Sequence, residues 1–229
     1  MKPGITVLIE QRGGEIKRPS LEALSEALRL KETLGGPVIA GVIGKDAATI
    51  AAKLEASGAD RILAISNDAL ELYSTESYGR AASQIVRAAD TGVILIAATV
   101  QGRDLAAAVA GALDLAYAAE CVKLQVEDGK LVAVRPVYAG RALATVSSNS
   151  EPFILSLRPN VFALGTPPGG SAGVEILEAD FDPAASRARV TAVTAADKGR
   201  KDVSEADAVV AAGRGVGGPE GFAPIEELA

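Results

Sequence analysis

Residues 93–115, VILIAATVQGRDLAAAVAGALDL, decide the fold class of this chain. The first six residues of the stretch are all apolar, which is typical of a strand buried on both faces of a parallel sheet. An alanine-rich helix is predicted from Asp104 to about Leu115, with Asp104 as its N-cap. A buried strand that leads into a helix is the repeating unit of an open α/β sheet.

The residues before this stretch repeat the same alternation. Strands are predicted at residues 5–9, 38–43 and 61–65, and helices after Pro19-Ser20, after an N-cap at Asp46 and from Thr75. Parallel strands are joined by right-handed crossovers through a helix. The order therefore predicts an α/β fold, an open and mostly parallel sheet with helices on both faces.

The pattern changes near Glu120. Two apolar segments, residues 122–126 and 131–137, flank Glu127-Asp128-Gly129, and Asp-Gly favours the tight turn of a β-hairpin. Further short strands are predicted at residues 142–148, 153–157, 174–179 and 189–194. Some antiparallel strands are therefore expected at one side of the sheet.

A polar, charged segment at residues 197–204 is predicted to be a linker. It divides the chain into an N-terminal α/β domain, residues 1–197, and a second part, residues 198–229. In the second part, residues 208–212 are predicted to be a strand that leads into a glycine turn and a helix at Pro219-Glu220. This order is the incomplete start of a second doubly wound domain, so we expect the chain to be C-terminally truncated.

The residue types that are missing exclude several kinds of site. The chain has no His, which excludes Ser-His-Asp and Cys-His triads and imidazole metal ligands. Cys121 is the single cysteine, and its apolar neighbours indicate a core residue rather than a nucleophile. The carboxylates show no paired acid–base arrangement. We therefore expect no catalytic residues and no metal site.

Charge and hydropathy exclude further classes. Of the 229 residues, 23 are Lys or Arg and 29 are Asp or Glu, which gives a net charge of −6, and only 3% are aromatic. An acidic chain with few aromatic residues is a poor nucleic-acid binder. The apolar runs are too short for a signal peptide or a membrane span. These features predict a protein without nucleic-acid partners, located in the cytoplasm.

The glycine turn carries the clearest candidate site. Gly213, Gly215 and Gly218 match the G-x-G-x-x-G spacing that brings a backbone close to a pyrophosphate. The complete fingerprint needs a later strand and an acidic residue, so within this chain a simple strand-to-helix turn is favoured. Arg214 has the planar fork that suits a phosphate or a polarised carbonyl. The alternative for Arg214 is a solvent-exposed turn residue.

Two other clusters allow two interpretations each. Gln101-Gly102-Arg103-Asp104 follows the buried strand and could approach a ligand, but an Asp104 cap with a surface Arg103 is favoured. The segment from Arg135 to Arg141 could form a binding surface or only a β-turn corner.

Four segments taken together resemble one known family. They are residues 99–105 (TVQGRDL), 135–142 (RPVYAGRA), 155–162 (LSLRPNVF) and 209–222 (VVAAGRGVGGPEGF). In this order they resemble the electron transfer flavoprotein alpha subunit, and the resemblance extends over essentially the whole chain. The last segment is similar to the start of that family's FAD-binding domain.

The resemblance implies an electron carrier rather than an enzyme. Family members form a heterodimer with a beta subunit and hold one FAD, mainly in the C-terminal domain of the alpha subunit. They take electrons from flavin dehydrogenases such as the acyl-CoA dehydrogenases of fatty acid β-oxidation. They pass these electrons to electron transfer flavoprotein-quinone oxidoreductase. By position, Arg214 matches the arginine that contacts FAD, and Gly213 and Gly215 would let the backbone approach the cofactor.

The chain departs from the family pattern after the glycine turn. The later family segments that bind most of the FAD have no counterpart here, so we expect FAD binding by this chain to be weak or absent. Residues 1–197 would then supply a scaffold and a surface for the beta subunit. An alternative is a stand-alone nucleotide-binding or sensor domain that uses Gly44-Lys45-Asp46 and Gly102-Arg103. A purely structural subunit, with the helix at residues 105–113 as an oligomer face, is a third possibility.

Overall fold

The strand predicted in the deciding stretch is β6, Val93–Ala97, and all of its residues are buried. The computed structural model describes residues 2–182, 185–194, 203, 206 and 208–229. Among them, seven strands form one sheet, in the order β12-β5-β4-β1-β6-β11-β7, and every pairing in it is parallel. The other strands are β1 Ile5–Ile9, β4 Val38–Gly44, β5 Arg61–Ser66, β7 Ala116–Cys121, β11 Phe153–Leu157 and β12 Gly173–Ile176. The edge strand β7 was not predicted.

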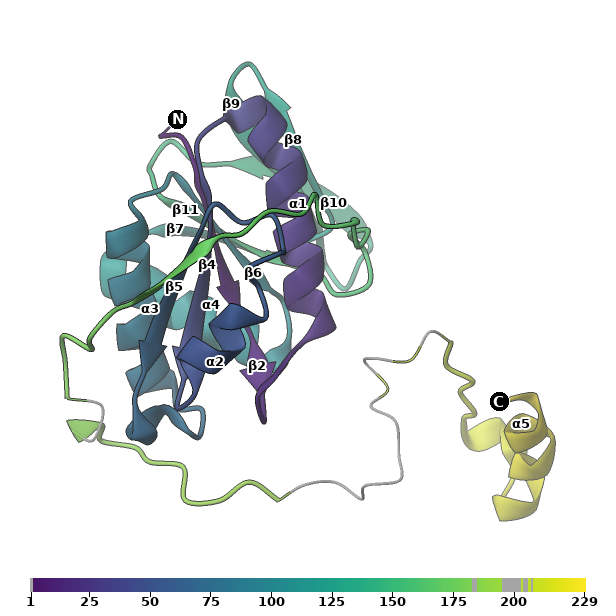
Figure 1. Ribbon diagram of the computed structural model, residues 1–229. Helices are drawn as coiled ribbons and strands as arrows, with labels where there is room; N and C mark the ends of the chain where they lie inside the picture. Colours follow the sequence, from purple (N-terminus) through teal and green to yellow (C-terminus); the bar gives the residue numbers. More distant parts are fainter. Residues whose placement is uncertain (1, 183–184, 195–202, 204–205, 207) are drawn as a thin grey trace. The chain divides into compact units, whose positions relative to one another are not determined.

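Helices cover both faces of this sheet (Figure 1). The helices α1, Arg18–Leu34, and α2, Ala47–Ala52, pack on one face, where they form one core cluster with alternate strand residues. The helices α3, Thr75–Ala89, and α4, Val100–Leu113, form the second cluster on the other face. The predicted α/β class is therefore confirmed.

The predicted antiparallel strands form a separate small sheet. It consists of β8 Lys123–Glu127, β9 Lys130–Val137 and β10 Ala142–Ser147, in the order β10-β9-β8. The hairpin predicted at Asp128-Gly129 joins β8 and β9, and Glu127 pairs with Lys130 there. A short hairpin of β2, Gln11–Arg12, and β3, Glu15–Ile16, was not predicted.

The prediction that Asp104 caps the helix after β6 was wrong. The helix begins four residues earlier, and Thr99 is its N-cap, because the Thr99 hydroxyl accepts a hydrogen bond from the Gly102 amide at 2.9 Å. The Asp104 carboxylate instead accepts hydrogen bonds from Tyr73 and Thr75, at 2.5 and 2.6 Å, which ties α4 to the start of α3. Asp46 does lie at the N-cap of α2, without a hydrogen bond from its side chain.

Two predicted strands are absent from the described residues. Neither residues 189–194 nor residues 208–212 are in a strand. A strand is held by hydrogen bonds to a neighbouring strand, and neither segment has such a partner among the described residues. The predicted linker, residues 197–204, lies outside the described residues except for Val203.

The chain divides into two compact units, Met1–Val193 and Thr194–Ala229. The second contains two short 3₁₀ helices, η4 Arg214–Val216 and η5 Pro219–Phe222, followed by α5, Ala223–Leu228. The helical turn predicted at Pro219-Glu220 is therefore confirmed. Within the described part of the chain, no helix combines the length and the apolar composition needed to cross a membrane.

Candidate functional site

The glycine turn of the second unit is closed by backbone hydrogen bonds. The Val216 amide donates to the Gly213 carbonyl at 3.2 Å, and the Gly217 amide donates to the Arg214 carbonyl at 3.3 Å. Gly217 has a φ of 78°, a left-handed conformation that glycine adopts without strain. The turn therefore has a defined shape of its own.

Arg214 lies on the open side of this turn. Its side chain is exposed and has no hydrogen bond or ion pair within the part of the chain that the structure describes. A Cβ atom built on Gly213, Gly215 or Gly218 would have no neighbour within 4 Å, so the space in front of these residues is open. Arg214 also lines a surface hollow with Ala212, Phe222 and Glu226.

The structural need for glycine at position 221 was not predicted from the sequence. A Cβ on Gly221 would lie 2.1 Å from the Val216 carbonyl oxygen, so only glycine permits η5 to pack against η4. The sequence places Gly221 directly after Pro219-Glu220, but this spacing does not indicate a close contact with the Val216 backbone.

The groups that the turn exposes are of the kind that binds the anionic part of a dinucleotide. An unengaged guanidinium and accessible backbone are the groups that bind a phosphate or an electron-rich carbonyl. In unit Thr194–Ala229 the described residues leave the hollow open to solvent, whereas a small-molecule site encloses most of its ligand. The turn therefore offers a guanidinium and open backbone to an anionic ligand without an enclosing site.

The alternative nucleotide site, at the carboxyl ends of β1, β4 and β6, is filled by protein. The cavity there measures about 10 Å³, which is room for no more than one water molecule. The Gln11 side chain donates to the Ile43 carbonyl at 3.3 Å and occupies the space beside Gly44. A Cβ on Gly102 would lie 1.9 Å from the Ala97 oxygen, so Gly102 packs against protein and faces no ligand.

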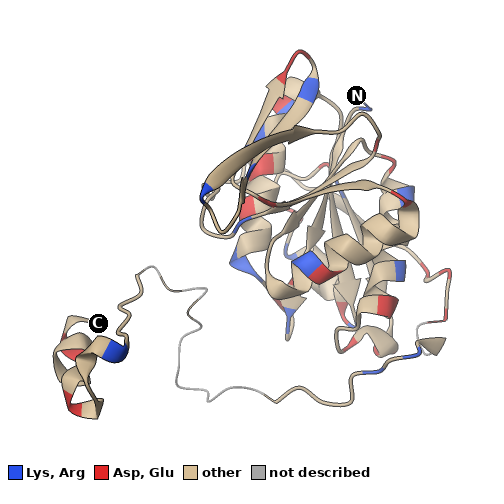
Figure 2. Cartoon of the chain, turned by 180° about the vertical axis from the view of Figure 1, so that it is seen from behind, with Lys and Arg blue, Asp and Glu red and all other residues tan. Residues whose placement is uncertain are grey.

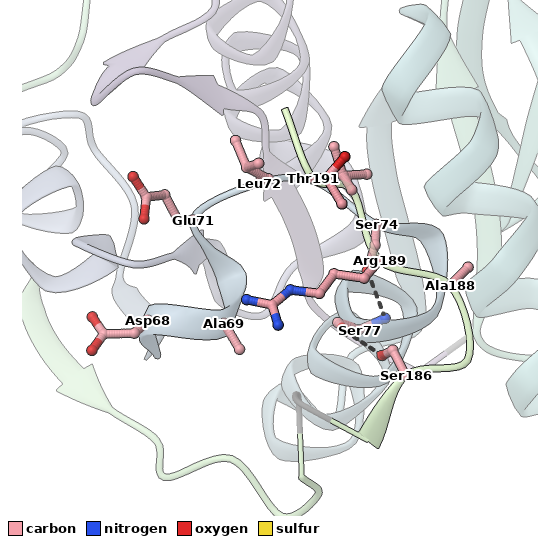
Figure 3. Close-up of a pocket in the computed structure, with 11 residues that line it drawn as sticks. Asp68, Ala69, Glu71, Leu72, Ser74, Ser77, Ser186, Ala188, Arg189 and Thr191 are labelled. Atoms are coloured by element: carbon pink, nitrogen blue, oxygen red, sulfur yellow. Dashed lines mark hydrogen bonds between the residues drawn. The ribbon is translucent and has the colours of Figure 1, made fainter. Parts of the chain in front are cut away.

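A larger hollow, of about 370 Å³, lies at the carboxyl end of β5 (Figure 3). Its walls are the turn around η1, Asp68–Leu70, the start of α3, and residues 186–191. The hydroxyls of Ser77 and Ser186 are 2.6 Å apart, and Arg189 extends toward the η1 turn. No residue predicted as a cofactor contact lines this hollow.

The cluster predicted around Arg103 joins a carboxylate that the sequence analysis missed. Arg103 and Arg158 each donate to Glu120, at 2.9 and 3.0 Å, so three chain segments meet at the end of β7. Glu120 has a φ of 58°, which is uncommon for a residue with a side chain. No sequence signal predicts such a conformation for a glutamate.

The segment from Arg135 to Arg141 forms the end of the β9–β10 hairpin, as the β-turn interpretation required. Three consecutive residues, Tyr138, Ala139 and Gly140, have positive φ values of 52°, 55° and 83°. The Tyr138 side chain is 82% exposed. The turn therefore places a large aromatic ring in solvent on a strained backbone.

Cys121 is buried, as its apolar neighbours predicted. Burial raises the pKa of the Cys121 thiol to about 12, which keeps it protonated near neutral pH. The described residues contain no group of three or more Cys, Asp or Glu side chains arranged to hold a metal ion. Acidic and basic residues are interspersed along the elements of the first unit that this view shows (Figure 2).

Comparison with known proteins places this α/β unit and the glycine turn in one family. The family model for the electron transfer flavoprotein domain matches residues 5–197, and the chain belongs to the electron transfer flavoprotein family. Protein FixB of Clostridium saccharobutylicum is 34% identical over 229 residues, 99% of this chain and 68% of that protein.

Two further relatives carry the subunit name. The electron transfer flavoprotein subunit alpha of Thermoanaerobacterium thermosaccharolyticum is 33% identical over 98% of this chain and 69% of its own length. That of Clostridium acetobutylicum is 34% identical over 99% of this chain and 69% of its own length. The resemblance to the alpha subunit is thus confirmed.

Proposed function

We propose that this chain acts as the alpha subunit of a heterodimeric electron transfer flavoprotein. It would carry electrons through FAD from flavin dehydrogenases, such as acyl-CoA dehydrogenases, to a quinone oxidoreductase in the cytoplasm of the cell. The observation that carries the proposal is the continuous match to proteins named subunit alpha over nearly all of this chain, glycine turn included. The protein would be a carrier and have no substrate chemistry of its own.

Arg214, with Gly213 and Gly215, would contact the cofactor. Bound FAD supplies the reversible uptake and release of electrons. The guanidinium of Arg214 would place a positive charge beside the cofactor, which favours an anionic group there. Because Arg214 has no partner among the described residues, no hydrogen bond or ion pair has to break before this contact forms.

The first unit would supply the scaffold and the surface for the beta subunit. Within the described residues, β10 pairs only with β9, so its other edge offers unpaired backbone groups to a further strand. Leu143 on β10 is 66% exposed, and Tyr138 lies at the adjoining turn. Exposed apolar and aromatic side chains beside a free strand edge are typical of a protein interface.

The cofactor proposal is tested by the visible absorption spectrum of two purified proteins. The first is this chain alone, in which we expect little or no flavin absorbance. The second joins this chain to the part of the Clostridium acetobutylicum relative beyond the match, produced together with that organism's beta subunit. We expect flavin bands in this complex, and Arg214→Met should reduce its FAD content while Arg12→Met does not. A flavin-free complex would contradict the cofactor proposal.

The docking surface is tested by co-purification with the same beta subunit. We expect Leu143→Glu to weaken the complex because it introduces a charge at an apolar contact. Val100→Glu is the matched control, since Val100 is 81% exposed at the start of α4. Equal loss of complex in both variants would show that β10 is not the docking edge.

A further inference from the structure

Beyond β12 the chain stays attached to the first unit as a strap, which we define as residues 177–182 and 185–191. The Leu177 amide donates to the Ala64 carbonyl at 2.8 Å, which prolongs the pairing of β12 with β5 by one residue. The strap then contacts α3 at Gln84, and further on it contacts the first turn of that helix. It therefore passes along α3 in the direction opposite to the helix.

Gln84 binds the backbone of the strap with both ends of its side-chain amide. Its Nε2 donates to the Glu178 carbonyl at 2.6 Å, and its Oε1 accepts a hydrogen bond from the Asp180 amide at 3.1 Å. A carbonyl and an amide two residues apart are the groups that a neighbouring parallel strand would bind. The Gln84 side chain thus takes the place of a strand partner.

The side chains of the strap alternate between the protein and solvent. Leu177, Ala179 and Phe181 are half-buried against the core cluster that α3 and α4 form, while the residues between them are exposed. A period of two is that of a β-strand with one buried face. The first half of the strap is therefore held by apolar packing as well as by Gln84.

The second half of the strap is held mainly by polar contacts. The hydroxyls of Ser186 and Ser77 are 2.6 Å apart, and the Arg187 amide donates to the Glu76 carboxylate at 2.9 Å. Beyond these contacts the strap forms one wall of the hollow of about 370 Å³ beside η1 (Figure 3). Because side chains do not fill that space, this half of the strap contributes little apolar packing.

We propose that the strap is a releasable anchor, held by Gln84, that limits the distance between the second unit and the first. With the strap bound, the connection to unit Thr194–Ala229 begins only after residue 191. With the strap released, the connection would begin after β12, and residues 177–191 would add up to about 50 Å of extended chain. Beyond Leu177 the strap has no place in the hydrogen-bond ladder of the sheet, so its release would leave the sheet intact.

The anchor belongs to the chain itself and requires neither FAD nor a beta subunit. Its test is therefore independent of the proposed function. A chain that binds no flavin can still show a bound strap, and a flavoprotein can have a strap that is not anchored.

The first test is limited digestion of the full chain with trypsin, followed by mass spectrometry. The strap carries trypsin sites at Arg187 and Arg189, and residues 198–201 carry three more. Cleavage follows the population of released chain when release is fast. We therefore expect the strap sites to be cut at least tenfold more slowly than the sites in residues 198–201. Equal rates in the wild-type chain would overturn the proposal.

Replacement of Gln84 tests its role as the residue that holds the strap. We expect Gln84→Ala to speed cleavage at Arg187 and Arg189 about fivefold or more, the effect of losing two hydrogen bonds. Cleavage within residues 198–201 should not change. Arg87→Gln is the matched control, because Arg87 is exposed on the same helix and makes no hydrogen bond among the described residues. No change in Gln84→Ala, or the same change in both variants, would overturn the role of Gln84.

The second test measures the reach of the second unit by small-angle X-ray scattering. Gln84→Ala combined with Phe181→Ala removes the hydrogen bonds and the largest apolar contact, so the strap should be released. Ser77→Cys combined with Ser186→Cys replaces two hydroxyls that are 2.6 Å apart, and its disulfide should keep the strap bound. We expect a larger maximum dimension in the first variant than in the oxidised second variant. Equal maximum dimensions would overturn the proposal.

Circular dichroism of each variant separates release of the strap from loss of folding. If a variant at Gln84 does not fold, Phe181→Ala alone decides the question in both tests, because it changes only the strap. We then expect faster cleavage at Arg187 and Arg189 and a larger maximum dimension than in the wild-type chain. Unchanged cleavage in this folded variant would overturn the proposal.

Discussion

Replacement of Gly102 by alanine tests the conclusion that the carboxyl end of the sheet is closed by protein. The new Cβ would lie 1.9 Å from the Ala97 carbonyl oxygen, whereas real Cβ contacts are no shorter than 3.0 Å. The start of α4 and the end of β6 would have to separate by about 1.1 Å. Such overpacking typically costs about 1–3 kcal/mol, and the obstacle here is backbone, which has no alternative rotamer. We expect a loss of about 2–3 kcal/mol in the free energy of unfolding, measured by urea denaturation.

The same helix supplies a matched control. A Cβ on Gly111 would meet nothing within 4 Å, so Gly111→Ala changes only the helix propensity. Alanine is favoured over glycine in a helix interior by about 0.5–1 kcal/mol, and we expect Gly111→Ala to stabilise the protein by that amount. If Gly102→Ala were as stable as Gly111→Ala, α4 would not pack against β6 as described. The crevice could then open for a ligand, and the nucleotide-sensor alternative would regain support.

Three other predictions concern single groups of the first unit. Thr99→Ala should cost about 1–2 kcal/mol in urea denaturation because the N-cap of α4 is lost. Cys121, whose pKa burial raises to about 12, should react with iodoacetamide at pH 8 only after unfolding, and rapid labelling of the folded chain would disprove its burial. Burial of the neutral Cys121 thiol should contribute its full stabilisation below about pH 8.5, where the unfolded thiol ionises. This stabilisation should decline above that pH. The hydrogen bonds from Arg61 lower the pKa of Glu175, so the advantage of wild type over Glu175→Gln should be present at pH 7 and vanish as the pH falls below about 4. Because the pair is exposed, that advantage should be below about 1 kcal/mol, and a pH-independent difference would show that the ion pair does not cause it.

Local patterns predicted the central strands and both helix layers. In β6 the apolar run matches a fully buried strand, and in α3 the apolar period and the N-cap match the observed helix and its buried face. Local propensity and packing therefore favour the same structure in both. The edge strand β7 was missed because it has no such agreement. Its Ala116–Cys121 sequence is mixed, and it becomes a strand by pairing with β11, which lies far away in the chain.

The start of α4 shows a different limit of prediction. Thr99 and Asp104 are both good N-cap residues, and the sequence alone favoured the second. Packing favoured a helix that begins at Val100, because this start places Asp104 within hydrogen-bond reach of Thr75, the first residue of α3, and of Tyr73 just before it. A choice between two local signals was thus made by a contact about thirty residues away in the chain.

The glycine turn and the cluster around Glu120 differ in how far the sequence alone could locate them. The glycine turn could be located from the sequence because its chemistry lies within six consecutive residues, 213–218. The cluster of Arg103, Glu120 and Arg158 could not, because it is assembled only by the sheet order, which places β11 between β6 and β7. Glu120 completes the cluster through a backbone conformation that its residue type disfavours. Two arginines and the Ser156 hydroxyl hold that conformation. The cluster is therefore expected to lose its geometry when Glu120 is replaced, because Arg103 and Arg158 would lose the carboxylate that they share.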